Sequence, residues 1–122
     1  MDNRLEKALE FSNYRVTLFQ ELKILKLKMA NDLMYSHGGG TFKITRELIS
    51  FCQSLLADDQ TETILLDIND TPIFIDALSE FGDKIYSQYF EALNEYHIEY
   101  ERLRKARSVE KIVDLSPDEK KN

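Results

Sequence analysis

The sequence has 122 residues, of which 43% are hydrophobic and 31% charged, and this size and composition predict a single folded domain with a core of its own. It lacks the run of about 18 apolar residues that a transmembrane helix needs, and it lacks the pattern of a secretory signal. The single cysteine, Cys52, excludes an internal disulfide, and together with only His37 and His97 it excludes a Cys/His zinc site.

The net charge of −6 is unevenly distributed. Between Asp58 and Glu101 there are twelve acidic residues and one base, Lys84, so this block carries a charge of −11. A protein that binds nucleic acid through its phosphates needs the opposite balance. The composition therefore argues against a general nucleic-acid binder.

The first predicted element is a long helix over residues 2–36, which contain no Gly or Pro and are rich in strong helix formers. Its apolar residues recur with steps of three and four, in an eleven-residue rhythm: Phe11, Tyr14, Leu18, Leu22, Leu25, Met29 and Leu33. The glycines Gly38, Gly39 and Gly40 are interpreted as the signal that ends this helix.

A compact insert is predicted at about residues 41–75. It starts with a short strand over 41–44 and continues with a helix that Thr45 caps and that runs to about Leu56. The inward face of this helix comprises Leu48, Ile49, Cys52, Leu55 and Leu56. Residues 63–67 and 72–75 then predict a β-hairpin, because Asn69 and Asp70 tolerate the positive φ of a tight turn.

A second long helix is predicted from the N-cap Asp76 to about Val109, with the same rhythm of apolar residues. The charges favour antiparallel pairing of the two long helices. In this pairing the position numbers of two facing residues add up to about 111. This register places Leu18 opposite Leu93, Met29 opposite Gly82, and Lys28 near Asp83. The predicted fold is mainly α: an antiparallel hairpin of two long helices, coiled-coil-like, with a small α+β insert at one end. Residues 1–113 form its single domain, and residues 114–122 form a disordered tail.

The patterns that suggest catalysis or metal binding fail at their most specific positions. His37 to Gly40 spell the string that forms an oxyanion hole in some esterases, yet the chain has no Gly-x-Ser-x-Gly elbow. Residues 67–78 begin like a calcium loop, but Pro72 replaces the required Gly and Leu78 replaces the required Glu. His97 is interpreted as a core or interface residue and Cys52 as a buried apolar one. We therefore expect no enzyme activity, no metal and no cofactor.

Two surfaces of the second long helix are candidate contact sites. Large aromatic side chains are more numerous than one partner helix covers, and they supply the candidate interface: Tyr86, Tyr89, Phe90, Tyr96 and Tyr100. Glu91, Glu95 and Glu99 recur every four residues and form a candidate acidic contact face. The bases that follow them, Arg102, Arg104, Lys105 and Arg107, are interpreted as locally neutralised by nearby acids.

Two stretches of the chain resemble a family of small proteins encoded by T-even-like myoviruses of marine cyanobacteria. The first runs from Asn31 to Ser36 through the glycines to Thr41-Phe42 and Glu47 to Ile49, and the second runs from Tyr89 through His97 to Val109. The resemblance implies a phage protein made in a bacterial cytoplasm. It implies no activity and no catalytic residues.

The expected function is that of a non-enzymatic protein-interaction module, a phage structural or assembly protein that forms a homo-oligomer. Its expected partners are a second copy and another phage or host protein, without direct nucleic-acid or membrane contact, in the host cytoplasm or the virion. The alternative is an acidic regulator that binds basic surfaces of the transcription or other nucleic-acid machinery.

Overall fold

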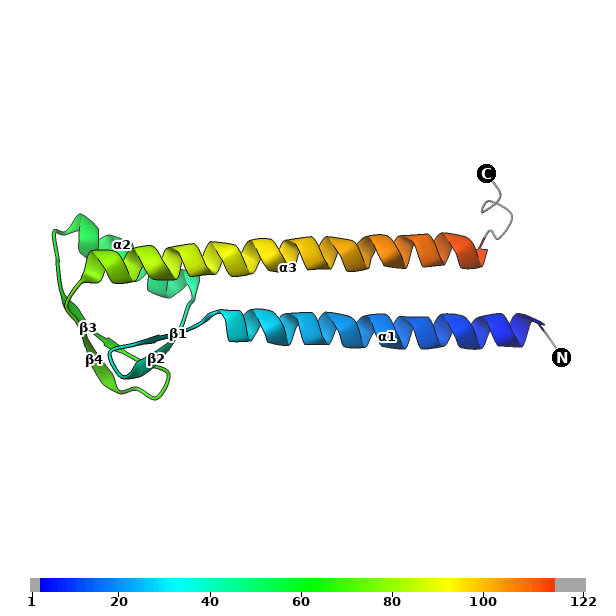
Figure 1. Cartoon of the computed structure of the whole chain (residues 1–122), viewed down its shortest axis with the longest axis horizontal. Helices are drawn as coiled ribbons and strands as arrows, with labels where there is room; N and C mark the ends of the chain where they lie inside the picture. The colour runs from blue at the N-terminus through cyan, green and yellow to red at the C-terminus, as the bar shows by residue number, and fades with distance from the viewer. Residues whose placement is uncertain (1–2, 116–122) are drawn as a thin grey trace. The chain divides into compact units, whose positions relative to one another are not determined.

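The computed structural model describes residues 3–115, and the side chains of residues 3–106. In chain order the elements are α1 (Asn3–Asp32), β1 (Met34–His37), β2 (Gly40–Lys43), α2 (Arg46–Ala57), β3 (Thr63–Leu66), β4 (Pro72–Ile75) and α3 (Leu78–Leu115) (Figure 1). The predicted mainly helical class is confirmed. Most of the predicted tail, residues 116–122, lies outside the described residues, and α3 begins two residues after the predicted N-cap Asp76.

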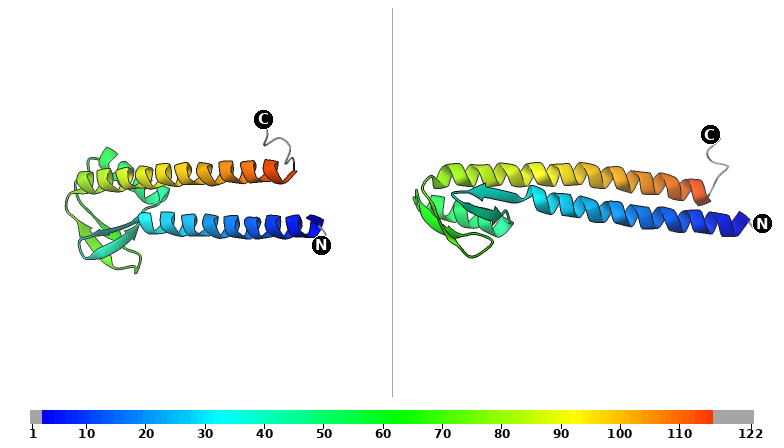
Figure 2. Two further views of the ribbon diagram at one scale, coloured as in Figure 1. Left: turned by 45° about the vertical axis from the view of Figure 1, so that its right-hand side comes forward. Right: turned by 60° about the horizontal axis from the view of Figure 1, so that its bottom comes forward.

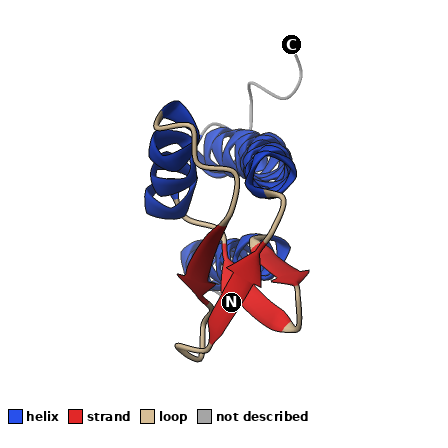
Figure 3. Cartoon of the chain, turned by 90° about the vertical axis from the view of Figure 1, so that its left-hand side faces the viewer, coloured by secondary structure: helices blue, strands red, loops and turns tan. Residues whose placement is uncertain are grey.

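Two compact units divide the chain. The central unit is the continuous stretch Met29–Asn94, and the end unit combines Met1–Lys28 with Glu95–Asn122. The central unit holds α2 and all four described strands, drawn in red in Figure 3. The end unit is helical over its described residues. Each unit is described below by itself.

The glycine segment forms a hairpin turn, and the prediction that it ends a long helix is wrong. The first helix ends at Asp32, and residues 34–37 form β1, which pairs antiparallel with β2 (Figure 2). Gly38 and Gly39 have φ values of 59° and 85° and join the two strands. Such a two-residue turn needs positive φ at both positions, which glycine supplies without steric cost. The turn geometry and the pairing with β2 therefore override the helix propensity of residues 33–36.

The end of α1 is fixed by hydrogen bonds from elsewhere in the central unit. The side-chain amide of Gln88 donates to the carbonyl oxygens of Asp32 and Met34, at 2.8 and 2.9 Å. The backbone N–H of Ile44 donates to the carbonyl of Leu33 at 2.7 Å. Carbonyls at a helix end have no partner within the helix, so these donors stabilise the change from helix to strand.

The helix α2 and the second hairpin form as predicted. Thr45 caps α2, because its side-chain oxygen accepts the backbone N–H of Leu48 at 3.1 Å. Strands β3 and β4 pair antiparallel from Thr63 opposite Ile75 to Leu66 opposite Pro72. Asp70 in their connecting loop has a φ of 59°, in agreement with the predicted turn.

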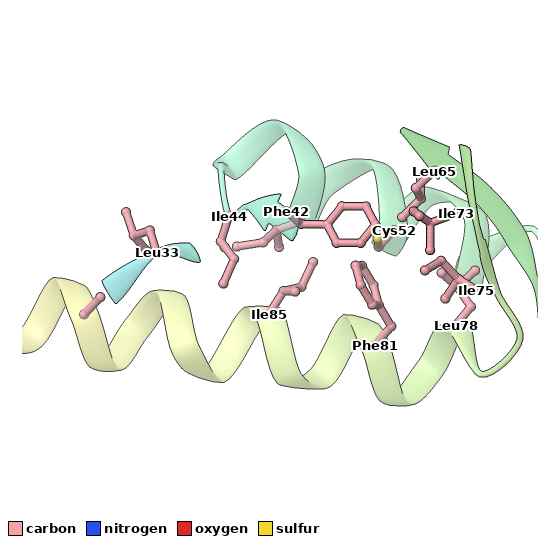
Figure 4. Close-up of a cluster of buried hydrophobic side chains, with 12 residues drawn as sticks. Leu33, Phe42, Ile44, Cys52, Leu65, Ile73, Ile75, Leu78, Phe81 and Ile85 are labelled. Carbon is pink, nitrogen blue, oxygen red and sulfur yellow. The ribbon is translucent and has the colours of Figure 1, made fainter. Parts of the chain in front are cut away.

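The core of the central unit lies between α2, the strands and the first turns of α3 (Figure 4). Phe81 is 1% exposed, and its ring lies 5.3 Å from those of His37 and Phe42 and 5.7 Å from that of Tyr35. The predicted inward face of α2 contributes to this core: Ile49 and Cys52 are buried in it, and Leu48, Leu55 and Leu56 pack against its edge.

Two glycines of the central unit stand in different surroundings. A methyl group on Gly40 would lie 2.7 Å from Cγ1 of Ile73, so β2 and β4 approach closely at this point. At Gly82 the nearest atom to such a methyl group is Cδ1 of Leu56, at 3.5 Å, an ordinary contact. Gly82 therefore faces α2, and its predicted position opposite Met29 is wrong.

A smaller core holds the end unit. Leu18 and Leu25 of α1 are buried together with Leu103 of α3, and Tyr14, Leu22 and Tyr96 pack around them. Lys28 Nζ lies 3.0 Å from Glu95 Oε1, so the position numbers of these facing residues add up to 123. The predicted register placed Lys28 near Asp83, with the position numbers of facing residues adding up to about 111. This register is wrong. The reason is that Leu78, Phe81 and Ile85, the first apolar positions of α3, pack in the core of the central unit.

Candidate interaction surfaces

The aromatic residues of α3 divide into packed and exposed side chains. In the central unit, Tyr89 packs against the core, whereas Tyr86 and Phe90 are 46% and 42% exposed. The rings of Tyr86 and Phe90 lie 4.8 Å apart, and Tyr89 meets Phe90 edge-on at 5.8 Å. Neighbouring rings restrict one another's rotamers, so the two exposed rings form an ordered apolar surface.

The aromatic pair of the end unit shows a similar division. Tyr96 packs against the core of that unit, and Tyr100 is 40% exposed. Their rings stack at 5.9 Å with an interplanar angle of 25°. Of the five residues of the candidate interface, Tyr86, Phe90 and Tyr100 are thus exposed, and Tyr89 and Tyr96 are partly committed to the cores.

The candidate acidic face is partly neutralised by ion pairs. Glu95 pairs with Lys28, and Glu99 accepts a hydrogen bond from Arg102 Nε at 2.9 Å. Glu101 accepts hydrogen bonds from Arg104 Nη2 at 2.9 Å and Nε at 3.1 Å, which lower the pKa of Glu101 and raise that of Arg104. The predicted local neutralisation is confirmed for Arg102 and Arg104. Glu91 is exposed, and among the residues whose side chains are described no ion pair involves it.

An open groove of about 360 Å³ runs along the end unit. Its lining combines apolar residues with the ion pair of Lys28 and Glu95, and includes Glu21, Ile24, Leu25, Glu99, Arg102 and Leu103. Both charge signs meet on this surface, so it does not favour a ligand of one charge.

The two histidines and the cysteine lie on three different elements. His37 packs edge-on against Phe81 as part of β1, and His97 is exposed on α3. Cys52 is 1% exposed, and burial raises the pKa of its thiol, which keeps it protonated. Over the described residues, no group of three or more His, Cys, Asp or Glu side chains is placed to hold a metal ion. None of the helices in that part of the chain has the length and apolarity to cross a membrane.

A buried carboxylate, Asp67, organises the loop between β3 and β4, a role that the sequence analysis missed. Its Oδ1 accepts the backbone N–H groups of Asn69 and Thr71, at 2.9 and 3.0 Å, and its Oδ2 accepts that of Thr41 at 3.2 Å. The N–H of Ile68 also donates to the carbonyl of Thr41 at 2.9 Å. Asp67 therefore joins the two hairpins. The hydrogen bond from Thr71, with those from Asn69 and Thr41, lowers the pKa of Asp67 against the opposing effect of burial.

Because the folded-state pKa of Asp67 is lowered, we expect its contribution to stability to be present above the ordinary value of about 3.9 and lost as the pH falls through the folded-state value. Asp67→Asn replaces one accepting oxygen with an N–H₂ group, so this variant should melt at a lower temperature at neutral pH and show a shallower loss in acid. Asp70→Asn is the matched control, since asparagine tolerates the same positive φ. Thermal melts across pH measure both variants, and equal curves for Asp67→Asn and Asp70→Asn would refute the assigned role.

Two exposed apolar surfaces were also missed by the sequence analysis. On the outer face of the second hairpin, Ile64 lies opposite Phe74, and both are more than half exposed, as is Leu66. On α1, the exposed apolar residues are Leu5, Leu9, Val16, Phe19, Ile24 and Leu27. The alternation of strand residues and the eleven-residue spacing of Leu5, Val16 and Leu27 are the signals that could have located them.

Comparison with known proteins gives no relative from which a role could be transferred. No protein-family model matches the chain, no curated protein shows significant similarity to it, and no solved structure shows a significant match.

Proposed function

We propose that this protein is a non-enzymatic protein-interaction module that self-associates and serves phage structure or assembly. The observation that supports the proposal is the exposed ring pair Tyr86 and Phe90, which lies beside a well-packed core. Aromatic side chains provide a large contact area at a low entropic cost and are enriched at interfaces. The phage setting follows from the sequence resemblance alone.

The scaffold of the proposed module is an antiparallel hairpin of α1 and α3 that carries the α+β insert at one end. Its support comes from the end unit, where Leu18 and Leu25 contact Leu103 and Lys28 pairs with Glu95. As residue numbers rise along α1, their partners' numbers fall along α3, which is the antiparallel order.

We expect the double substitution Tyr86→Ser and Phe90→Ser to weaken binding of the protein to its partners, including a second copy, because the ordered apolar surface is lost. Sedimentation velocity over a range of protein concentrations measures self-association, and circular dichroism checks that the helices persist. Phe51→Ser is the matched control, since Phe51 is a half-exposed ring on α2 in the same unit. A wild-type protein that stays monomeric at every concentration would contradict self-association.

The alternative, an acidic regulator, is supported by the exposure of most acids in the block from Asp58 to Glu101. Among them, Asp58, Asp59, Glu62, Asp70, Asp76, Glu80, Asp83 and Glu91 are exposed. Attraction of a basic partner to such a field weakens with salt, because the screening length is about 8 Å at physiological ionic strength. Affinity capture from infected cells separates the two functions: capsid or tail proteins support the assembly role, and polymerase or nucleoid proteins support the regulator.

A further inference from the structure

The second hairpin, formed by β3 and β4, has one buried face and one exposed apolar face. The inward side chains of both strands are buried in the core of the central unit, where Figure 4 labels Leu65 among them. The alternate side chains Ile64, Leu66 and Phe74 are 63%, 60% and 57% exposed. Ile64 lies directly opposite Phe74. Leu66 lies opposite Pro72, which is also exposed, so the four outward side chains form one continuous apolar patch.

Exposed carboxylates stand at both ends of this patch. Glu62 and Asp76 lie one residue outside the strands, at the open end of the hairpin, and Asp70 lies in its connecting loop. Residues 47–83 contain nine acidic residues and no Lys, Arg or His. Among the residues whose side chains the structure describes, no ion pair involves Glu62, Asp70 or Asp76. The apolar patch is therefore flanked by negative charge at each end.

We propose that this outer face binds an extended segment of a different protein, in which apolar side chains lie between two outer lysines or arginines. The inference rests on the proposed role as a protein-interaction module, and it adds a second contact to the self-association assigned to Tyr86 and Phe90. In an extended segment, side chains two residues apart lie on one side at intervals of about 6.8 Å, the same repeat as in the hairpin. Two apolar residues at that spacing match the two cross-strand pairs of the patch, and the outer bases reach the carboxylates at its ends.

The charges select a basic partner and argue against a second copy at this face. Because acids lie at both ends of the patch, pairing of the face with itself brings carboxylates together in either orientation. The same acids repel nucleic acids and anionic lipid surfaces. Lysine and arginine carry long apolar stems that pack on apolar surfaces while their charged groups stay in water. A segment with apolar residues between such bases therefore complements both the patch and its ends.

The first test measures binding of a labelled peptide, Lys-Thr-Leu-Thr-Leu-Thr-Lys, to the full-length protein by fluorescence anisotropy. When the peptide is extended, its lysines and leucines lie on one side. We expect saturable binding that weakens as salt screens the charges. Replacement of both lysines by Glu, or of both leucines by Ser, should abolish binding. The proposal is overturned if the lysine peptide shows no saturable binding, or if the glutamate peptide binds equally well.

Charge variants of the protein locate the contact. Glu62→Gln combined with Asp76→Asn should raise the Kd of the lysine peptide by about 2- to 30-fold, the range expected from the loss of two exposed ion pairs. Asp83→Asn combined with Glu91→Gln is the matched control, because it removes two exposed carboxylates from α3 and should leave the Kd unchanged. Equal increases for both variants would mean that net charge, and not the hairpin, attracts the peptide, which contradicts the proposal.

The apolar patch is tested by Ile64→Thr combined with Phe74→Thr. Threonine is suited to strands, so this variant should keep the hairpin and lose peptide binding. Circular dichroism melts check the fold. A wild-type Kd for this variant would refute the patch as the contact. If its melting temperature falls, the charge variant at Glu62 and Asp76, which alters only exposed side chains, still decides the question.

The proposed function and this inference fail in different ways. Tyr86→Ser combined with Phe90→Ser should bind the lysine peptide as tightly as the wild type while its self-association weakens. If that variant loses the peptide and the hairpin variants retain it, the outer face of the hairpin is not the site. If the wild type is monomeric at every concentration but binds the peptide with the expected dependence on the hairpin, self-association fails and this inference stands.

Discussion

Phe81→Ala should destabilise the protein by about 3–5 kcal/mol, which is the usual cost of removing a fully buried ring. Phe81 is 1% exposed, and its ring contacts side chains from β1 and β2, including His37 and Phe42. The cavity left by the ring would be bounded by strands that other contacts hold in place, so relaxation can recover only part of the loss. A whole domain is typically stable by about 5–15 kcal/mol, so this substitution removes a large share.

The control for this substitution is Phe51→Ala, which removes the same side chain from an exposed position on α2. We expect it to change the free energy of unfolding by no more than about 0.5 kcal/mol. Urea denaturation followed by circular dichroism measures both variants. If their midpoints shift equally, the assignment of Phe81 to the centre of the core is refuted.

Alanine at Gly40 and alanine at Gly82 should act in opposite directions. At Gly40 the new methyl group would lie 2.7 Å from Cγ1 and 2.8 Å from Cδ1 of Ile73, as well as 3.2 Å from Cβ of Asp67. These atoms must move in a packed interior, and such overpacking costs about 1–3 kcal/mol. At Gly82 the methyl group meets only Leu56 and Cys52, at 3.5 and 4.0 Å.

Inside a helix, replacement of Gly by Ala stabilises by about 0.5–1 kcal/mol, because alanine loses less backbone entropy on folding. Gly82→Ala should therefore raise the melting temperature, and Gly40→Ala should lower it. Differential scanning calorimetry of the two variants beside the wild type gives the signs. A rise for Gly40→Ala would show that β2 and β4 do not approach as closely as described.

Local signals in the sequence were sufficient to predict some elements and insufficient for others. The cap at Thr45 and the second hairpin depend on neighbouring residues, and both are confirmed. The end of α1 was missed because it depends on Gln88, which is 56 residues from Asp32. The register of α1 and α3 was missed because the sequence does not show that Phe81 and its neighbours serve the central core and not α1.

For the candidate surfaces too, local features could be predicted from the sequence and features that depend on distant residues could not. Tyr86 and Phe90 are exposed, as residues of the candidate interface should be. Asp67 was missed because its partner Thr41 is 26 residues away. The exposed apolar residues of α1 were missed because an eleven-residue spacing locates one face of a helix but does not show whether another element covers that face.

The division of the chain also sets the order in which its parts can form during synthesis. The central unit is the continuous stretch Met29–Asn94, whereas the end unit needs residues from both sides of that stretch. On a ribosome, α1 is made first, and its partners Glu95 and Leu103 are added only after the whole central unit has been translated. Until then the apolar residues of α1 that α3 covers, Leu18 and Leu25, lack their partner, so a nascent chain can meet the α1 helix of a neighbouring nascent chain before it meets its own α3.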